Sequence, residues 1–310
     1  MKEFVIIADT SCDLEESFCA DEGIILIPCH ITTADGGDYF AYPRWDGTSP
    51  EEFYSVIKRN PSCCKTAPPN IYEFEKVFEA AIAEGKDVLL MTISSGMSGA
   101  YNFSLIAREN IRKRIPSADI RIIDTQRFAP AFGLMINEAL RLQKSGLSLQ
   151  ETAAALENNK NRYHQAGWMD DLAYVAKKGR LTHAKAFFGT LAGIKPIGEF
   201  DSNGFTTVIG KVKGTRTALN VLLSYVEATA AAPEENIFFV AHSNRLKQAM
   251  EYKAMLEERF HPKAVYFGEV HASCGVNVGP GLVAAYYMGT PISEDLSEER
   301  KLIESFAEGE

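Results

Sequence analysis

The sequence predicts a two-domain α/β protein, with a largely parallel sheet flanked by helices in the first half and a mixed sheet in the second. Three observations support this fold class. Short apolar runs alternate with helical segments along residues 1–160, as in parallel sheets that are buried on both faces. A polar stretch at 158–162 looks like a junction, which predicts domains at 1–160 and 161–310. An Asn203-Gly204 turn between two apolar runs then indicates an antiparallel hairpin.

The composition argues against several classes of protein. The chain has 310 residues and is 46% hydrophobic, which suits a large buried core. The formal net charge is −9, and the one short basic run, Arg112-Lys113-Arg114, is expected to be the solvated end of a helix, so nucleic-acid binding is not expected. No apolar run approaches the ~20 residues of a membrane span. The start, MKEFVIIADTSCD, is typical of a first strand rather than a signal peptide, so a cytoplasmic protein without stable membrane insertion is expected.

Neither a disulfide scaffold nor a metal site is expected. The six cysteines show no CxxC spacing, and the six histidines lie far apart without paired ligand spacing. No cofactor motif is present either. The pair Cys63-Cys64 is interpreted as two small residues in a loop, with a redox role as the alternative.

The first half is expected to alternate strands and helices. Asp13 and Glu16 stand in capping-box spacing before a helix that ends near Gly23. A polar, Gly-rich excursion covers 32–49. Ser148 and Glu151 cap the last helix of this half. The other expected elements are strands at 4–8, 24–29, 87–93 and 120–124, and helices at 50–59, 71–85, from 100 onward, and at 133–146.

The second half is expected to combine a hairpin with alternating helices and strands. The hairpin joins 194–200 to 205–212 through the Asn203-Gly204 turn. The other expected elements are helices at 170–178, 183–192, 216–230, 244–259 and 280–288, and strands at 237–243 and 264–270.

The turn Ser94-Ser95-Gly96-Met97-Ser98-Gly99 is the first candidate site. It joins a buried strand to a helix N-terminus, where hydroxyl and backbone N–H groups favour a phosphate, a reacting oxyanion or a bound carboxylate. A Walker A loop and a G-x-S-x-G elbow are both absent. His242 and His271 show no acidic partner in the sequence that would complete a triad. A serine hydrolase or phosphate-ester enzyme is the alternative function, and a plain helix cap is the structural alternative.

Three further stretches carry candidate binding residues. Thr66, in KTAPPN, stands on a stiff backbone before a helix, or simply leads into that helix. Asn277 stands beside Gly279-Pro280-Gly281, which is expected to open a helix with free N–H groups or to be turn punctuation. Arg180 would pair with an anion or cap carbonyl groups. Lys195 is expected to be a solvated strand residue.

Taken together and in order, these stretches resemble the DegV family. The matching segments span essentially the whole chain: ADTSCDL, Thr66, ISSGMSGAYN, IIDTQRFAPAFG, KKGRLTHAKAFFGTLAGIKPI, GKVKGTRTAL and GVNVGPG. The resemblance implies two α/β domains that bind a long-chain fatty acid, such as palmitate, between them. It also implies a carrier rather than an enzyme, since some members hand the acyl group to a fatty acid kinase for phospholipid synthesis.

The resemblance also implies which residues hold the ligand carboxylate. Thr66 and Ser95 take the main roles, with Ser94 as a neighbour and with Asn277 and Arg180 as further contacts. The family's Thr-Ser-Gln-Pro-Ser motif reads Thr66-Ala67-Pro68-Pro69-Asn70 here. Asn277 replaces a family histidine and cannot donate a charged hydrogen bond, so the carboxylate network of this chain differs from that of the family.

The acyl chain is expected to supply most of the affinity. Burial of a sixteen-carbon chain contributes ~10 kcal/mol in gross terms, at ~0.8 kcal/mol per CH₂. Each apolar candidate for the tunnel has ordinary core packing as its alternative. These candidates are Met97, Phe128, Phe132, Met135, Phe187, Phe188 and Ile194.

A cluster of basic residues in GKVKGTRTALN is the candidate partner surface. Lys211, Lys213 and Arg216 lie within a few residues of one another on an acidic protein. The resemblance places Arg216 where basic residues of the family are thought to meet the kinase. Local positive charge would steer such a partner, so Lys213 and Arg216 are the expected contacts. The alternative is that these side chains are simply solvated.

Overall fold

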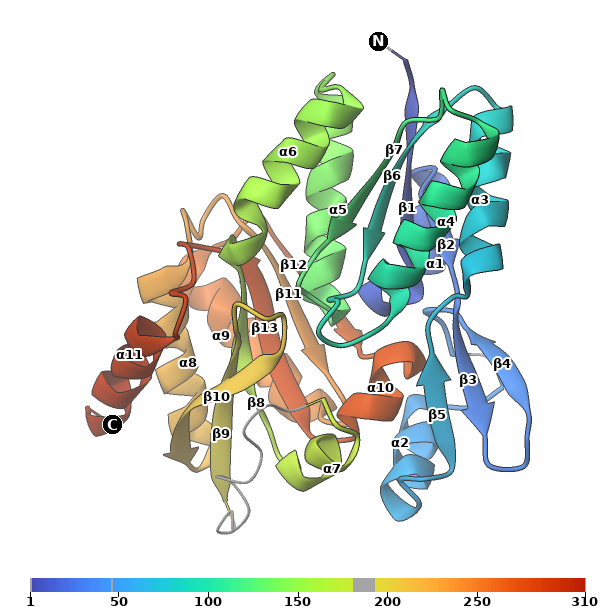
Figure 1. Cartoon of the computed structure of the whole chain (residues 1–310). Coiled ribbons are helices and arrows are strands. Elements are labelled where there is room, and N and C mark those ends of the chain that lie inside the picture. Colours follow the sequence, from blue (N-terminus) through green and yellow to red (C-terminus); the bar gives the residue numbers. More distant parts are fainter. Residues whose placement is uncertain (1, 46, 181–192, 310) are drawn as a thin grey trace. The chain divides into compact units, whose positions relative to one another are not determined.

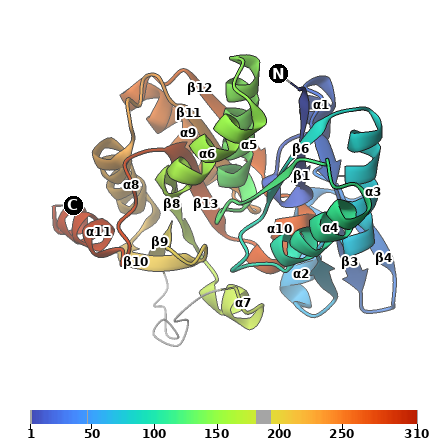
Figure 2. The same cartoon turned by 45° about the horizontal axis from the view of Figure 1, so that its top comes forward.

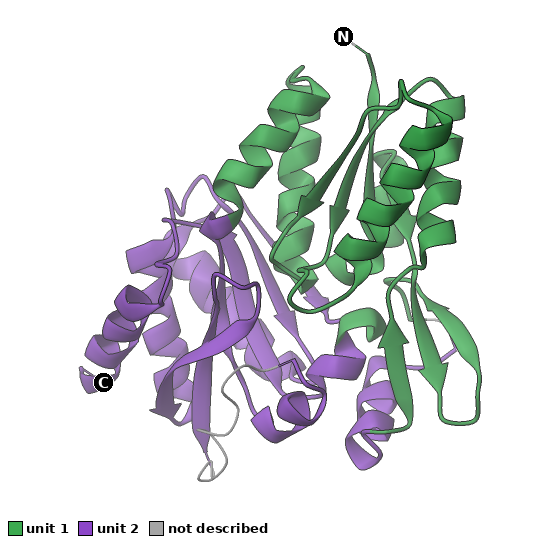
Figure 3. Cartoon of the chain, in the orientation of Figure 1, with its two compact units in different colours: residues 1–45, 62–160, 271–274 green, residues 46–61, 161–270, 275–310 purple. Residues whose placement is uncertain are grey.

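The structure is a computed structural model that describes residues 2–45, 47–180 and 193–309. The chain divides into two compact units (Figure 3). Unit 1 comprises Met1–Trp45, Ser62–Lys160 and His271–Cys274, and unit 2 comprises Asp46–Pro61, Asn161–Val270 and Gly275–Glu310. Whether 1–160 and 161–310 are separate folding domains stays a prediction.

Unit 1 contains the expected parallel sheet, in the order β2-β1-β6-β7. All six residues of β1 are buried, as are all but the first of β6. Burial on both faces explains why these strands appear in the sequence as continuous apolar runs. The strands are β1 (Phe4–Asp9), β2 (Ile25–Ile27), β6 (Asp87–Thr92) and β7 (Ile120–Asp124).

Helices cover both faces of this sheet (Figure 1). α5 (Ala129–Lys144) and α6 (Leu149–Asn159) lie on one side, and α3 (Ile71–Ala83) and α4 (Ala100–Arg114) lie on the other. The capping box predicted for Ser148 and Glu151 is confirmed at the start of α6. The basic run 112–114 ends α4, as expected. The predicted mixed α/β class is therefore correct for this unit.

The capping box predicted for Asp13 and Glu16 is wrong. Asp13 follows the 3₁₀ turn η1 (Thr10–Cys12) with φ 55, and helix α1 (Glu16–Asp21) begins without a side-chain cap. Instead, Oδ1 of Asp13 accepts a hydrogen bond from the backbone N–H of His271 at 3.2 Å. A tertiary contact across 258 residues thus takes the carboxylate that local spacing assigned to a helix cap.

Unit 1 also holds a three-stranded antiparallel sheet that the sequence interpretation missed. Its strands, in the order β4-β3-β5, are β4 (Asp38–Ala41), β3 (Cys29–Thr33) and β5 (Cys64–Ala67). The single strand predicted at 24–29 breaks at Pro28, which has no N–H to donate. The predicted excursion 32–49 contains β4, and Cys64 begins β5 rather than lying in a loop. β4 and β5 are largely exposed, so apolar alternation does not mark them.

Unit 2 is built on a mixed six-stranded sheet in the order β10-β9-β8-β13-β11-β12. β11 and β12 pair in parallel, and the other neighbours are antiparallel. The predicted hairpin is confirmed, with the N–H of Gly204 donating to the carbonyl of Asp201 at 3.0 Å. The strands are β8 (Tyr163–Met169), β9 (Ile194–Phe200), β10 (Thr206–Lys213), β11 (Ile237–His242), β12 (Ala264–Glu269) and β13 (Leu282–Met288).

Two long helices cover one face of this sheet, and they were both predicted. α8 (Thr215–Thr229) packs against β8 and β10, and α9 (Leu246–Phe260) packs against β11, β12 and β13 (Figure 2). The C-terminal helix α11 (Ser297–Glu308) packs against α8 and β10. The remaining short elements are α2 (Pro50–Arg59), η2 (Lys160–Arg162), α7 (Leu172–Lys177) and α10 (Ala272–Val278).

The helix predicted at 280–288 is wrong, because this segment is the central strand β13. An apolar run that is buried on both faces has no periodicity that separates a helix from a strand. Gly279-Pro280-Gly281 therefore leads into a strand, and the N–H of Gly281 donates to the carbonyl of Ser243 at 2.8 Å. The helix predicted at 183–192 lies outside the described residues.

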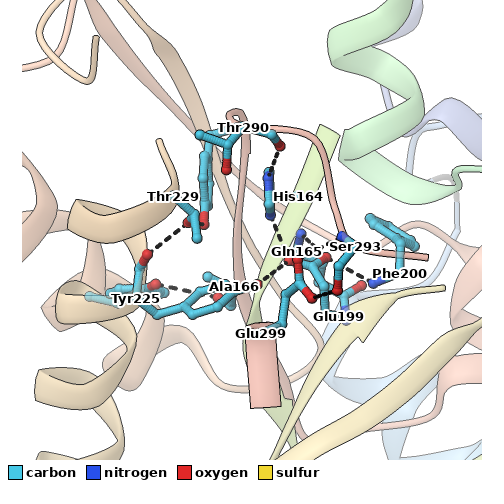
Figure 4. A network of polar contacts seen from close by, with 12 residues as sticks. His164, Gln165, Ala166, Glu199, Phe200, Tyr225, Thr229, Thr290, Ser293 and Glu299 are labelled. Carbon is cyan, nitrogen blue, oxygen red and sulfur yellow. Dashed lines mark hydrogen bonds and ion pairs between the residues drawn. The ribbon is translucent and has the colours of Figure 1, made fainter. Parts of the chain in front are cut away.

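A buried network of hydrogen bonds connects β8, β9 and the segment after β13 (Figure 4). Nδ1 of His164 lies 2.8 Å from Oε2 of Glu199, and Nε2 lies 2.8 Å from the carbonyl oxygen of Thr290. Oε1 of Glu199 accepts backbone N–H groups of Gln165 and Phe200, each at 2.8 Å. Both ring nitrogens of His164 and both carboxyl oxygens of Glu199 therefore have hydrogen-bond partners within this unit.

Candidate functional site

Ser94 shapes the turn that follows β6. Its side chain is buried, and its backbone N–H donates to the carbonyl of Arg127 at 2.9 Å. The hydroxyl oxygen accepts from the N–H of Gly96 at 3.2 Å, and the carbonyl oxygen accepts from the N–H of Met97 at 3.0 Å. The turn then reaches Gly99, the N-cap of α4. Ser94 therefore holds the conformation that presents the next residue.

Ser95 is the exposed residue of this turn, and Asp124 holds it in place. The backbone N–H of Ser95 donates to Oδ1 of Asp124 at 3.0 Å, and its hydroxyl donates to Oδ2 at 2.5 Å. Asp124 ends β7, the neighbour of β6, and Oδ1 also accepts the N–H of Gln126 at 3.1 Å. The carboxylate is buried, so it anchors the turn from the adjacent strand end.

Asp9 anchors the same turn from the other neighbouring strand, β1. Its Oδ2 accepts the N–H of Ile93 at 2.7 Å, and its Oδ1 accepts the N–H of Ser11 at 3.0 Å. Burial raises the pKa of the Asp9 carboxyl, although the hydrogen bonds from Ile93 and Ser11 oppose that shift. The carboxyl ends of three parallel strands thus meet here, which is where open α/β sheets bind ligands.

Sequence reasoning did not assign roles to Asp9 or Asp124. The signal that would have found them is their position, because each one ends a buried apolar strand. Strands that are neighbours in a parallel sheet bring such residues to one edge.

Thr66 lies in β5, opposite Ile31 of β3, and is partly exposed. The chain continues through two prolines to Asn70, the N-cap of α3. Oδ1 of Asn70 accepts the N–H of Glu73 at 3.0 Å, and the Glu73 carboxylate accepts the N–H of Asn70 at 2.7 Å. The last residue of the motif therefore caps a helix, which fits the interpretation of this stretch as a stiff helix lead-in.

His30 ties β3 to the same helix cap. It pairs with Ala67 in the sheet, and its Nε2 lies 3.0 Å from Oε2 of Glu73. Nδ1 lies 3.3 Å from Oδ2 of Asp38. Burial lowers the pKa of His30, but the hydrogen bonds and charges of Glu73 and Asp38 outweigh it and raise the pKa above its ordinary value. His30 was not among the predicted residues.

The other predicted head-group residues belong to unit 2. Asn277 is half-buried in α10. Arg180 lies just after α7, and its Nη1 donates to the carbonyl of Lys178 at 2.6 Å, which is the carbonyl-capping role considered for it. The prediction that Lys195 is solvated is wrong, because its side chain is 15% exposed and Nζ lies 2.6 Å from Oδ1 of Asp170.

The two histidines considered for a catalytic triad have carboxylate partners of their own. Nδ1 of His242 lies 3.6 Å from Glu269, and Nδ1 of His271 lies 3.4 Å from Asp13. A triad needs its serine hydroxyl to donate to an imidazole. The hydroxyl of Ser95 donates to a carboxylate instead, which disfavours the hydrolase alternative.

The predicted tunnel residues lie in different surroundings. Phe132 and Met135 are completely buried in α5, while Met97 and Ile194 are half-buried. Phe128 is buried just before α5. Phe187 and Phe188 lie outside the described residues. The assignment of these side chains to an acyl tunnel stays a prediction.

The predicted partner residues flank Gly214 in unit 2. Lys213 is exposed at the end of β10. Arg216 lies in the first turn of α8, and its side chain is 70% exposed. Its Nη1 lies 3.0 Å from Oε1 of Glu251, so part of its charge is offset within the unit.

The described residues bear on two further classes of site, membrane spans and metal centres. None of the helices in the described ranges combines the length and the apolar character that a bilayer crossing requires. In the same ranges, no three His, Cys, Asp or Glu side chains are grouped so that they could hold a metal ion.

Known solved structures share this fold. A DegV family protein from Thermus thermophilus, described as binding fatty acid, aligns with a TM-score of 0.83 and 22% identity, over 93% of this chain and 100% of that one. DegV from Bacillus subtilis, described as a fatty acid binding protein, aligns with a TM-score of 0.79 and 23% identity, over 94% and 100%. A DegV family protein from Eubacterium eligens, loaded with heptadecanoic acid, aligns with a TM-score of 0.79 and 19% identity, over 92% and 99%.

Similarity in sequence covers nearly the whole chain. A DegV domain-containing protein of Clostridium perfringens is 31% identical over 291 residues, which is 93% of this chain and 98% of that protein. A DegV domain-containing protein of Streptococcus pyogenes is 28% identical over 286 residues, 92% and 98% respectively. The model of the DegV family of uncharacterised proteins matches residues 3–290. This chain therefore belongs to the DegV family.

Proposed function

We propose that this protein binds a long-chain fatty acid such as palmitate, with the carboxyl head at Ser95 and Thr66. The observation that carries the proposal is the exposed Ser95 hydroxyl, which Asp124 fixes at the carboxyl edge of the parallel sheet. Support also comes from the family, because solved structures of the same fold are described as fatty acid binding proteins.

The chemistry of the turn suits a carboxyl head. Hydroxyl groups and helix-terminal N–H groups form hydrogen bonds with carboxyl groups. Ser94 keeps the turn in shape, and Asn277 and Arg180 are proposed as further head-group contacts. None of these bonds needs to be strong, since the apolar chain contributes ~10 kcal/mol of gross burial energy.

The acyl chain is proposed to lie in an apolar tunnel. Its proposed lining combines the turn residue Met97, the start of α5 and the start of β9. The side chains are Met97, Phe128, Phe132, Met135, Ile194, Phe187 and Phe188.

We further propose that the protein is a cytoplasmic carrier without catalytic activity. It would present the fatty acid to a fatty acid kinase, which makes acyl phosphate for phospholipid synthesis. The exposed cations Lys213 and Arg216 are the proposed contacts, because positive charge on an acidic protein steers a partner to one place.

Native mass spectrometry of the purified protein tests the binding proposal. The expected result is a co-purified mass that matches a fatty acid, or stoichiometric uptake of added palmitate after delipidation. A protein that neither carries nor takes up palmitate would contradict the proposal. Turnover of acyl esters that is abolished by Ser95→Ala would support the hydrolase instead.

A further inference from the structure

The hydroxyl hydrogen of Ser95 is already committed to Asp124. Oγ of Ser95 donates to Oδ2 of Asp124 at 2.5 Å, while Oδ1 accepts the N–H groups of Ser95 and Gln126 at 3.0 and 3.1 Å. A serine hydroxyl has one hydrogen to donate and two lone pairs that accept. In this arrangement Ser95 can accept a hydrogen bond from a ligand, but it cannot donate one.

An ionised fatty acid does not match that arrangement. A carboxylate has only acceptor oxygens, so it would face the lone pairs of Ser95 with a second carboxylate, Asp124, directly behind them. A protonated carboxyl group does match, because its O–H donates to Oγ of Ser95 and continues the chain of hydrogen bonds to Asp124. Two carboxyl groups that share one site commonly keep one proton between them.

We propose that the fatty acid binds together with one proton, shared along the line head group–Ser95–Asp124. This inference rests on the proposed function and specifies the protonation of the same site. Asp124 is then a positioning residue, because it acts on the ligand through Ser95. Fatty acid in water is ionised at neutral pH, since carboxyl groups titrate near about pH 4–5. Binding at neutral pH therefore takes up one proton.

Two cationic side chains near Asp124 have carbonyl or carboxylate partners of their own. Nζ of Lys160, in the segment after α6, lies 2.6 Å from Glu157 and 3.4 Å from the backbone oxygen of Asp124. The guanidinium of Arg127 donates to the carbonyl of Gln126 at 2.8 Å.

Two further elements pack against this strand end. The first is β1, on the far side of β6. Its last residue, Asp9, accepts hydrogen bonds from the N–H groups of Ile93 and Ser11 and adds negative charge. The second is α4, which packs against β7 and has no charged residue in its first turn. Neither β1 nor α4 adds a cation for an ionised head group. Arg180, the cation among the proposed head-group contacts, has its Nη1 on the carbonyl of Lys178 at 2.6 Å.

Isothermal titration of the delipidated protein with palmitate measures the proton directly. Titrations at about pH 7.5, in two buffers of different ionisation enthalpy, give the number of protons taken up on binding. The wild-type protein is expected to take up about one proton, and Kd should rise about tenfold per pH unit between about pH 6 and pH 8.

Asp124→Asn is the informative variant. Its amide can donate to Oγ of Ser95, which releases the hydroxyl hydrogen for an ionised head group. The expected proton uptake is close to zero, and the Kd for palmitate should be nearly independent of pH. Asp119→Asn is the matched control, because it removes the same charge just before β7, from a pair with Arg121, and should leave uptake near one.

The outcomes separate the two proposals. Normal palmitate binding by the wild-type protein with no proton uptake would overturn this inference and leave the proposed function standing. Failure to bind palmitate at all would overturn both. The wild-type measurement decides the inference even if Asp124→Asn does not fold. Hexadecanol, which always carries a hydroxyl hydrogen, should bind with no proton uptake, and uptake with this ligand would also contradict the inference.

Discussion

His164 and Glu199 form a hydrogen-bonded pair in which both side chains are completely buried, with 2.8 Å between Nδ1 and Oε2 (Figure 4). The phenol of Tyr225 donates to the same carboxylate oxygen at 2.9 Å, and the ring of Tyr287 stacks on the imidazole at 5.2 Å. Every polar atom of the pair thus has a partner, which is the condition under which a buried polar pair is tolerated.

Replacing His164 alone should destabilise the protein strongly. His164→Leu leaves the buried Glu199 carboxyl group without its imidazole partner, and breaking a buried pair of this kind typically costs about 3–5 kcal/mol. The free energy of unfolding in urea, followed by circular dichroism, measures this loss. His261→Ala changes an exposed histidine and should cost far less. Equal stability of the two variants would show that the buried pair does not hold unit 2 together.

Thr66 and Ser95 should each contribute to fatty-acid affinity. Loss of one hydroxyl partner from a buried hydrogen-bond network that contains a charged group costs about 1.5–3 kcal/mol. Thr66→Ala and Ser95→Ala should therefore weaken palmitate binding about tenfold or more, with little change in the unfolding midpoint. Titration calorimetry of the delipidated proteins measures the effect.

Thr32→Val is the control for these two variants. Thr32 is exposed on β3, one position from the residue that pairs with Thr66, so its loss should leave palmitate affinity unchanged. Wild-type affinity in both Thr66→Ala and Ser95→Ala would remove these residues from the head-group site.

The His30 contacts should make the stability of the protein depend on pH. The raised pKa of His30 means that its charged pairing is fully present below about pH 6.5 and is lost as the pH rises above the folded-state pKa. Between about pH 6 and pH 8, wild type should lose more unfolding free energy than His30→Gln, by up to about 1 kcal/mol for such partly exposed pairs. Parallel urea titrations at the two pH values measure this difference, and identical pH dependences would refute it.

Charge reversal at Lys213 and Arg216 should impair delivery and not binding. The double variant Lys213→Glu, Arg216→Glu removes the proposed docking charges and places a carboxylate beside Glu251. Palmitate affinity should stay at the wild-type value, while acyl phosphate formation by a cognate kinase should slow, most clearly at low salt.

A control for that variant is Lys76→Glu, on an exposed position of α3 in unit 1. Its reversed charge should leave the kinase rate unchanged. Wild-type turnover by the double variant at low salt would mean that the kinase docks elsewhere.

Local sequence determined much of the secondary structure. The Asn203-Gly204 hairpin, the Ser148 capping box and the apolar strands of the parallel sheet formed as predicted. Each of these follows from interactions among residues within a few positions, or from burial on both faces of a sheet. Family membership was also evident, because the motifs lie in order along nearly the whole chain.

Only the tertiary structure decided which distant residues meet. Whether 282–288 is a helix or a strand depended on its neighbours β8 and β11, since a fully apolar run carries no period of its own. The bond from Ser95 to Asp124 spans 29 residues, and it exists because β6 and β7 are adjacent in the sheet. Asp13, which local spacing assigned to a helix cap, instead accepts a hydrogen bond from the backbone of His271, 258 residues away. Spacing along the chain cannot encode such pairings, because strand order sets them.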